Sequence, residues 1–264
     1  MDLLLQDKLV LVTGSTAGIG FAIAEVFAAE GARVIINGRS EERVAAASAS
    51  ILKKYPQAHL ESLVADLATA GAVEETIKRF PTVDVLVNNL GVYGPKNFED
   101  LSDEEWLSII ETNFLSGVRL CRHYLPAMKK PNWGRILFLS SESGVNIPVE
   151  MIHYGVTKTM QIALARGLAE TTIGTGVTVN SVLPGPTRSE GVEKFIADMA
   201  EKDGKTTAEV EKDFFATVRP SSLIQRFATV HEVATTVAYL ASPLAAATNG
   251  AAVRAEGGLL RSIL

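Results

Sequence analysis

Short apolar runs rich in Val, Ile and Leu alternate along the chain with longer stretches of helical periodicity. The runs lie at residues 8–13, 33–37, 60–65, 83–87, 135–140, 177–183 and 251–255. The runs do not regularly alternate apolar with polar residues, which predicts strands buried on both faces. Strands that alternate with helices form crossover units, and such units build a parallel sheet with helices on both faces.

The stretches between the runs carry their apolar residues on one helical face. They cover residues 19–30, 41–54, 69–80, 103–128 and 152–173. Ser102, followed by an acidic first turn, is a typical helix N-cap, and Gly31 stands where the first helix must end. We therefore expect one doubly wound α/β domain over residues 1–264, with a seven-stranded parallel sheet.

Residues 186–227 depart from this alternation, because they are charged and helix-like. Two apolar faces stand out there, formed by Val192, Phe195, Ile196 and Met199 and by Val210, Phe214, Phe215 and Val218. A helical excursion from one end of a sheet is suited to be a substrate-binding lid. The apolar faces either contact a largely non-polar substrate or pack the lid onto the domain.

Composition excludes several classes of protein. The net charge of −5 gives no basic footprint for nucleic acid. No apolar stretch reaches the roughly 20 residues that span a bilayer, and the first residues carry no basic segment, so we expect a soluble cytoplasmic protein. One cysteine and four scattered histidines provide neither a disulfide nor a metal site.

Residues 13–20 read T-G-S-T-A-G-I-G and join the first predicted strand to the first predicted helix. Glycine there allows a tight bend, close approach of the backbone to a pyrophosphate, and packing of helix on strand. The N–H groups at the helix start would bind phosphate; a tight turn without a ligand is the alternative. The candidate phosphate-binding residues are Gly14, Ser15, Thr16, Gly18, Ile19 and Gly20.

Further polar motifs follow the later strands in order. They are Asp66-Leu67, Asn88-Asn89-Leu90-Gly91, Asn113, Ser141, Tyr154 with Lys158, and Pro184-Gly185. Together with the G-x-x-x-G-x-G turn, this series resembles the short-chain dehydrogenase/reductase family over most of the chain; Leu90 stands where that family has alanine. The resemblance implies a Rossmann-type fold and NAD(P)-dependent hydride transfer between nicotinamide and a carbonyl or secondary alcohol.

Tyr154 and Lys158 are one helical turn apart, so their side chains share a face. A neighbouring cation lowers the pKa of a phenol from about 10, which suits the phenol to acid/base catalysis. The resemblance implies that Tyr154 is the general acid/base, that Lys158 binds the nicotinamide ribose and tunes the tyrosine, and that Ser141 orients the substrate oxygen. Ser140 and Ser143 adjoin Ser141, but the spacing to Tyr154 favours Ser141.

Asn113 falls inside a predicted helix, where asparagine is a poor helix former. The resemblance implies that it holds a water linking Lys158 to solvent and so completes an Asn-Ser-Tyr-Lys proton relay. His153 should point away from Tyr154, toward the substrate pocket or the surface, because adjacent helical residues diverge by about 100°. Cys121 is expected to be a small core residue.

The end of the second strand indicates the cofactor. It reads Ile36-Asn37-Gly38-Arg39, without the acidic residue that would bind a ribose 2′-hydroxyl. Arg39 suits a 2′-phosphate, which favours NADP over NAD; stacking on adenine or a solvated side chain are the alternatives. By resemblance, the remaining cofactor-binding residues are Asp66 and Leu67 at the adenine, Asn89 and Gly91 at the adenosine ribose, and Pro184, Gly185, Thr187 and Ser189 at the nicotinamide.

Other functions compete with this one. A non-catalytic dinucleotide-binding regulator would need the glycine turn but neither Ser141 nor Tyr154, and an epimerase or dehydratase usually has a longer chain. A 3-oxoacyl-carrier-protein reductase is the alternative substrate assignment. The positions of its carrier-docking basic residues are the neutral Asn132 and Thr175, although Lys129 and Lys130 are near.

The C-terminal residues 251–258 resemble the family's last strand and its Gly-Gly turn, with Glu256 where aspartate is common. Leu259, Leu260, Ile263 and Leu264 follow, and their exposure would be costly, which predicts burial at a subunit contact. The resemblance implies a homotetramer built through the last strand and the long helices.

Overall fold

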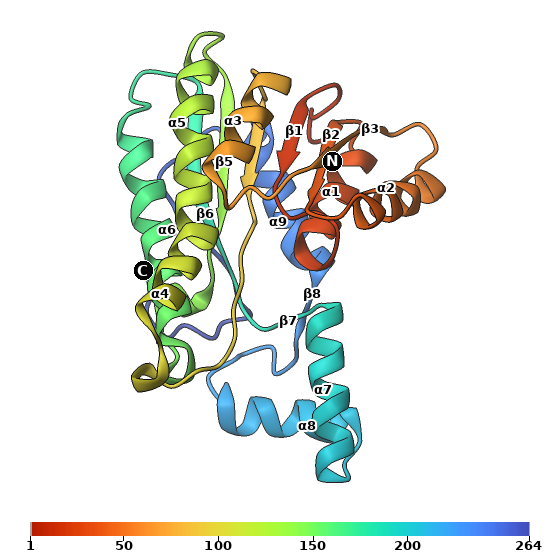
Figure 1. The fold of residues 1–264 in the computed structure, drawn as a ribbon, viewed down its shortest axis with the longest axis vertical. Helices are drawn as coiled ribbons and strands as arrows, with labels where there is room; N and C mark the ends of the chain where they lie inside the picture. The colour runs from red at the N-terminus through yellow and green to blue at the C-terminus, as the bar shows by residue number, and fades with distance from the viewer. Residues whose placement is uncertain (1, 264) are drawn as a thin grey trace.

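The computed structural model describes residues 2–263, which form a seven-stranded parallel sheet in the order β3-β2-β1-β4-β5-β6-β9 (Figure 1). Strand β1 pairs with β2 on one side and β4 on the other. The strands are β1 (Leu9–Val12), β2 (Arg33–Gly38), β3 (His59–Val64), β4 (Val85–Asn88), β5 (Gly134–Leu139), β6 (Val177–Pro184) and β9 (Ala252–Ala255). The predicted single α/β domain with this sheet is confirmed.

Alternate side chains of the strands enter two separate cores. Val10 and Val12 of β1 lie in the core under α1, α2 and α9, whereas Leu11 lies in the core under α3, α5 and α6. Figure 1 shows α1 and α2 on one side of the sheet and α5 and α6 on the other. The helices are α1 (Gly18–Ala29), α2 (Glu41–Lys54), α3 (Ala70–Arg79), α5 (Ser116–Lys129), α6 (Ile152–Glu170) and α9 (Val230–Ala241). No helix within residues 2–263 is long and apolar enough to cross a membrane.

Strand β3 does not meet the prediction of burial on both faces. It lies at the edge of the sheet, where it pairs with β2. Leu63 is its one buried residue, and Val64 is 46% exposed. An edge strand has a neighbour on one side only, and Glu61 and Ser62 interrupt the apolar residues of β3, so the fold buries less of it than of the inner strands.

The long helix predicted at residues 103–128 is divided. α4 (Asp103–Ile110) and α5 are joined by a π-helical turn, η2 (Glu111–Leu115), which contains Asn113. π-helical turns are rare and occur most often at functional sites. The predicted helix signals are confirmed, because Ser102 forms a capping box with Glu105 and Gly31 follows α1 with a φ of 76°.

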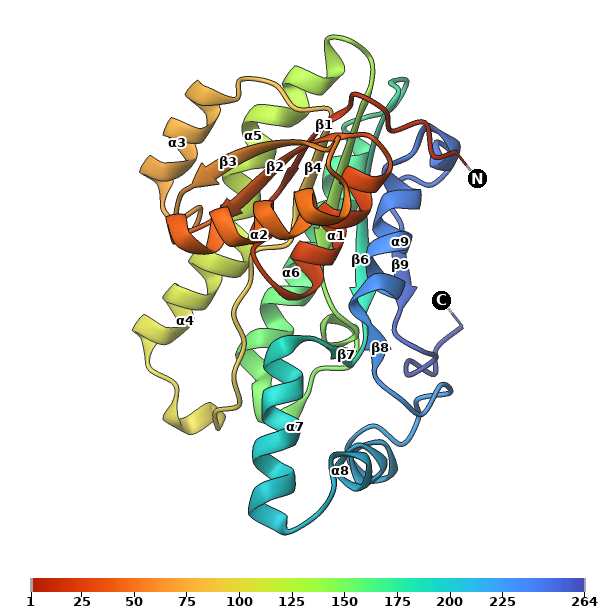
Figure 2. The same cartoon turned by 90° about the vertical axis from the view of Figure 1, so that its right-hand side faces the viewer.

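Residues 186–227 form a helical excursion that projects from the sheet (Figure 2). It contains α7 (Glu190–Asp203), α8 (Thr207–Asp213) and the π-helical turn η5 (Phe214–Val218), and β7 (Thr187–Arg188) pairs with β8 (Ala228–Thr229) at its base. Ile196, Val210, Phe215 and Phe227 bury one another in a core of their own. Packing within the excursion thus accounts for most of its apolar residues, while Phe195 stays 54% exposed.

The expectation that the C-terminal leucines are buried by a second subunit is wrong for Leu259 and Leu260. Both are buried within the chain, where they pack with Leu183 of β6. The carboxylate of Glu256 accepts hydrogen bonds from their backbone N–H groups. Ile263 is 96% exposed, and Leu264 lies outside the described residues.

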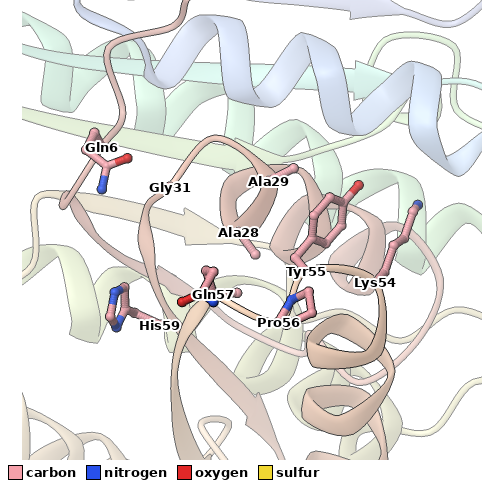
Figure 3. Close-up of a pocket in the computed structure, with 10 residues that line it drawn as sticks. Gln6, Ala28, Ala29, Gly31, Lys54, Tyr55, Pro56, Gln57 and His59 are labelled. Atoms are coloured by element: carbon pink, nitrogen blue, oxygen red, sulfur yellow. The ribbon is translucent and has the colours of Figure 1, made fainter.

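A surface cavity of about 470 Å³ lies far from the motif residues. Gln6, Gly31, Tyr55 and His59 are among its lining residues, as Figure 3 shows. Gly31 comes just before β2 and His59 begins β3, so the cavity adjoins the amino ends of these strands. Ligands of open parallel sheets bind at the carboxyl ends, so the active site must lie at the opposite edge.

The turn between β1 and α1 requires glycine for two reasons. Gly14 and Gly18 have φ values of 63° and 57°, which lie in the left-handed region. A Cβ atom on Gly20 would lie 2.4 Å from both the carbonyl oxygen of Gly14 and Nδ2 of Asn89. Close packing at Gly20 therefore holds the turn against the end of β4.

We expect Gly20→Ala to lower the free energy of unfolding by about 1 to 3 kcal/mol, because the added methyl group must displace backbone. Gly71→Ala is the matched control, since a Cβ there has no neighbour within 4 Å. Chemical denaturation of both variants measures the difference. Equal stability of the two variants would contradict the packing described for Gly20.

Candidate active site

Several motif residues meet at the carboxyl edge of the sheet. Nδ2 of Asn89, after β4, donates hydrogen bonds to the carbonyl oxygens of Thr13 and Gly14, at 2.9 and 3.1 Å. A Cβ on Gly91 would lie 3.6 Å from Nζ of Lys158. Motifs far apart in the sequence thus border one site.

Tyr154 and Lys158 lie on the same face of α6. The Nζ atom of Lys158 is 5.5 Å from the centroid of the Tyr154 ring. Burial raises the pKa of the Tyr154 phenol above its ordinary value, while hydrogen bonding to Ser141 opposes this shift. Burial therefore favours the neutral phenol of Tyr154, which is the form able to donate a proton.

Lys158 is buried, with 5% of its surface exposed. Its Nζ donates to the carbonyl oxygen of Leu139 at 2.6 Å and to Oε1 of Gln161 at 3.3 Å. Burial lowers the pKa of Lys158 to about 7, because an ammonium ion loses its hydration there. Its charge is therefore sensitive to small changes in its surroundings.

Ser141 is the serine of its cluster that faces Tyr154. Its hydroxyl also donates to a carboxylate oxygen of Glu142 at 2.5 Å. The hydroxyl of Ser140 instead donates to the backbone carbonyl of Lys158, and that of Ser143 to Glu142. Of the three serines, Ser141 is therefore the one beside Tyr154.

Asn113 braces two parts of the site from the π-helical turn η2. Its Oδ1 accepts from the N–H of Val92 at 2.8 Å, and its Nδ2 donates to Thr157 Oγ1 at 3.1 Å. Its backbone carbonyl accepts a hydrogen bond from Nε2 of Gln161 at 2.5 Å. Gln161 is therefore a site residue that the sequence analysis missed.

The start of α1 is suited to an anion. Its N-cap, Ala17, has no side-chain acceptor, whereas Ser40, Thr69 and Ser189 cap α2, α3 and α7. The first-turn N–H groups of α1 can therefore serve a phosphate. Another residue missed from the sequence is Asn37, which is buried and accepts from the N–H of Gly14 at 3.0 Å; a polar residue ending an apolar strand was its signal.

The residues expected at the adenosine have different surroundings. Arg39 is exposed directly after β2. Asp66 accepts a hydrogen bond from the N–H of Ala68, so its side chain shapes the turn after β3. Leu67 is 1% exposed and belongs to the core under α3 and α5, where apolar packing occupies its side chain.

The residues expected at the nicotinamide follow β6. A Cβ on Gly185 would lie 2.7 Å from the carbonyl oxygen of Glu256, so β6 and β9 approach closely there. The Thr187 hydroxyl donates to the carbonyl of Gly185. Ser189 caps α7, and its Cβ would lie 3.6 Å from a Cβ on Gly18, which brings the base of the excursion to the glycine turn.

The excursion also reaches the catalytic side chains through Arg219. Its Nε lies 3.4 Å from Oε1 of the buried Glu142, and a terminal nitrogen lies 3.8 Å from Glu150. Tyr93 packs on Tyr154 with ring centroids 5.9 Å apart. These contacts join segments that carry no recognisable motif, so they could not be predicted from the sequence.

His153 and Cys121 have structural surroundings. His153 is 7% exposed and packs edge-on against Trp106, so it does not lie at the surface. Cys121 is a core residue as predicted, and burial raises the pKa of its thiol to about 12. Within residues 2–263, no group of three or more His, Cys, Asp or Glu side chains is placed to hold a metal ion.

Comparisons with known proteins agree with this geometry. A family model described as short chain dehydrogenase matches residues 8–200. The chain is 49% identical to "Uncharacterized oxidoreductase YvrD" of Bacillus subtilis (strain 168), with 100% of both chains covered. It is 34% identical to a 3-oxoacyl-[acyl-carrier-protein] reductase of Aquifex aeolicus (strain VF5), covering 98% of this chain and 100% of that one.

Among solved structures, the fold matches L-sorbose reductase from Gluconobacter frateurii, complexed with NADPH and L-sorbose. The TM-score is 0.93 at 28% sequence identity, and 100% of both chains is covered. The chain belongs to the short-chain dehydrogenase/reductase family and is an oxidoreductase.

Proposed function

We propose that the protein catalyses the NADP(H)-dependent interconversion of a carbonyl compound and a secondary alcohol, with Tyr154 as the general acid/base. The observation that carries this proposal is the placement of Tyr154 beside both Lys158 and Ser141 at the carboxyl edge of the sheet. When bound, the cofactor supplies the hydride for reduction or accepts it in oxidation.

The chain's own residues handle the proton. In reduction, the Tyr154 hydroxyl donates its proton to the carbonyl oxygen, which becomes the alcohol hydroxyl; in oxidation the transfer is reversed. Ser141 orients that oxygen with its hydroxyl. Lys158, held against Leu139, places a positive charge near the phenol and favours its ionised form.

The glycine turn and the start of α1 would hold the cofactor's phosphates, because α1 lacks a side-chain cap. The exposed guanidinium of Arg39 is suited to the 2′-phosphate of NADP(H). The relative solved with NADPH supports this choice. We assign the nicotinamide end to the segment from Pro184 to Ser189.

A reductase of 3-oxoacyl groups on a carrier protein is a second candidate, favoured by the relative of that name. The residues at the expected carrier-docking positions weaken this candidate, because they are neutral and bond within the chain. Asn132 accepts from the N–H of Gly176, and Thr175 donates to Thr172. Lys129 donates to the carbonyl of Thr171. Faster reduction of the carrier-bound substrate than of its free thioester would select this candidate.

The excursion at residues 186–227 serves as the substrate-binding lid in this proposal. Its core is independent of the sheet, and Arg219 joins it to Glu142 beside Ser141. The lid therefore contributes one wall of the substrate site.

Tyr154→Phe should reduce kcat by at least about 10²-fold, because no other group supplies the proton as effectively. NADPH binding, followed by fluorescence titration, should stay within a few-fold of the unchanged protein. Tyr239→Phe, an exposed tyrosine on α9, is the control. Turnover at the original rate in Tyr154→Phe would exclude Tyr154 as the acid/base.

Arg39→Ala should raise the Kd for NADPH by about 10-fold, because a charged hydrogen bond to the 2′-phosphate is lost. The Kd for NADH should remain unchanged. Arg43→Ala is the control, since it removes an exposed arginine one turn further along α2. Equal effects on both cofactors would contradict the role of Arg39 in cofactor choice.

We also propose a homotetramer assembled through β9 and the long helices, since β9 forms an edge of the sheet. An unpaired parallel edge strand needs cover. Sedimentation velocity at micromolar concentration should show a tetramer. A stable monomer at that concentration would refute this arrangement.

A further inference from the structure

Gln161 completes a row of polar side chains on the buried face of α6. It lies one turn beyond Lys158 and two turns beyond Tyr154, so the three side chains share a face. Only 1% of its surface is exposed. A fully buried carboxamide is costly unless both of its ends are hydrogen-bonded.

Both ends of the Gln161 carboxamide have partners in the active site. Oε1 accepts from the Lys158 ammonium at 3.3 Å, and Nε2 donates to the carbonyl of Asn113 at 2.5 Å. The carboxamide thus spans from the catalytic helix to the π-helical turn η2. A carboxamide neither gains nor loses a proton at neutral pH, so this link positions groups and does not relay protons.

The surroundings of Lys158 explain why its hydrogen bond to Gln161 matters. Within the described residues, the acceptors of its Nζ are the Leu139 carbonyl and Gln161, so Gln161 is its side-chain acceptor. Burial is the cause of the lowered pKa of Lys158, and the acceptors of its ammonium among the described residues are both neutral. Hydrogen bonds to neutral acceptors favour the ammonium form and so oppose the effect of burial.

The ionisable groups around this pair come from three elements. Tyr154 lies on α6 itself, with its ring 5.5 Å from the ammonium. Glu142, in the turn after β5, and Tyr93, in the loop after β4, act on Tyr154. The segment η2 approaches with Asn113, which is neutral.

We propose that Gln161 is a positioning residue of the active site, whose carboxamide ties the Lys158 ammonium to the carbonyl of Asn113 and keeps that ammonium charged beside Tyr154. This inference rests on the proposed function, in which Lys158 binds the cofactor ribose and favours ionisation of Tyr154. It adds a determinant of the lysine charge that the Tyr-Lys motif does not contain.

The test is the pH dependence of the Kd for NADPH, measured by fluorescence titration from pH 6 to 10. A charged Lys158 favours the anionic cofactor, so the Kd should stay level at low pH and rise as the pH passes the pKa of Lys158. Gln161→Met keeps the side-chain volume but removes the acceptor, so this rise should begin about 0.5 to 1 pH unit lower. Gln161→Glu provides a charged acceptor, so the rise should begin at higher pH.

Two control variants and a check of folding isolate the effect of Gln161 on the pH profile. Lys158→Met should abolish the rise, which assigns it to this lysine. Gln57→Met makes the same chemical change at an exposed position and should leave the profile unchanged. Titration of the cofactor's own 2′-phosphate is common to all the proteins and cancels in the comparison. Circular dichroism verifies the fold of each variant.

The pH at which the Kd begins to rise is expected to shift in opposite directions in the two Gln161 variants. A merely structural role of Gln161 would not produce opposite shifts. Shifts in opposite directions would support the proposal, and either variant alone tests its own direction if the other fails to fold. Unchanged profiles, shifts in the same direction, or loss of the fold in both would overturn it. Failure of the proposed function is a separate result, seen as absent NADPH binding in the unchanged protein or full turnover in Tyr154→Phe.

Discussion

The close approach of α1 to the ends of β1 and β4 is the constraint on which the site depends. At Gly20 there is no room for a Cβ, and Asn89 bonds across the same gap to the Gly14 carbonyl. The packing brings the start of an uncapped helix to the carboxyl edge of a sheet whose two faces are both covered by helices. With both faces closed, this edge is where backbone N–H groups and polar side chains can meet a ligand.

Most of the sheet could be predicted from the sequence, because strands buried on both faces are continuous in apolar residues. The exception, β3, carries His59, Glu61 and Ser62 among its apolar residues and lies at the edge of the sheet, which the strand order determines. The π-helical turn at Asn113 escaped prediction for a different reason. One extra residue in a turn leaves the apolar periodicity on each side intact, so the pattern at 103–128 indicates a single helix.

The residues of the active site also differ in whether local sequence spacing predicts them. Tyr154 and Lys158 share a helix, and their spacing alone determines that they meet. Gln161 and Arg219 act through partners on other segments, Asn113 and Glu142, and no local spacing relates them. Asn37 had a local signal, a polar residue at the end of an apolar strand, but its bond to the Gly14 N–H depends on the pairing of β1 with β2.

Two ionisable side chains, Lys158 and Glu142, are buried at the site, and they are stabilised in different ways. Lys158 is buried without a carboxylate partner, so the protein bears a desolvation cost that neutral acceptors only partly offset. Glu142 is buried beside Ser141, but its charge is offset by Arg219, which belongs to the excursion at residues 186–227. A movement of the excursion that withdrew Arg219 would leave the Glu142 carboxylate without this cation, held by the hydroxyls of Ser141 and Ser143. The position of the excursion and the electrostatics of the Ser141 hydroxyl are therefore coupled through one ion pair, while those of Lys158 depend on the fixed framework of β5, η2 and α6.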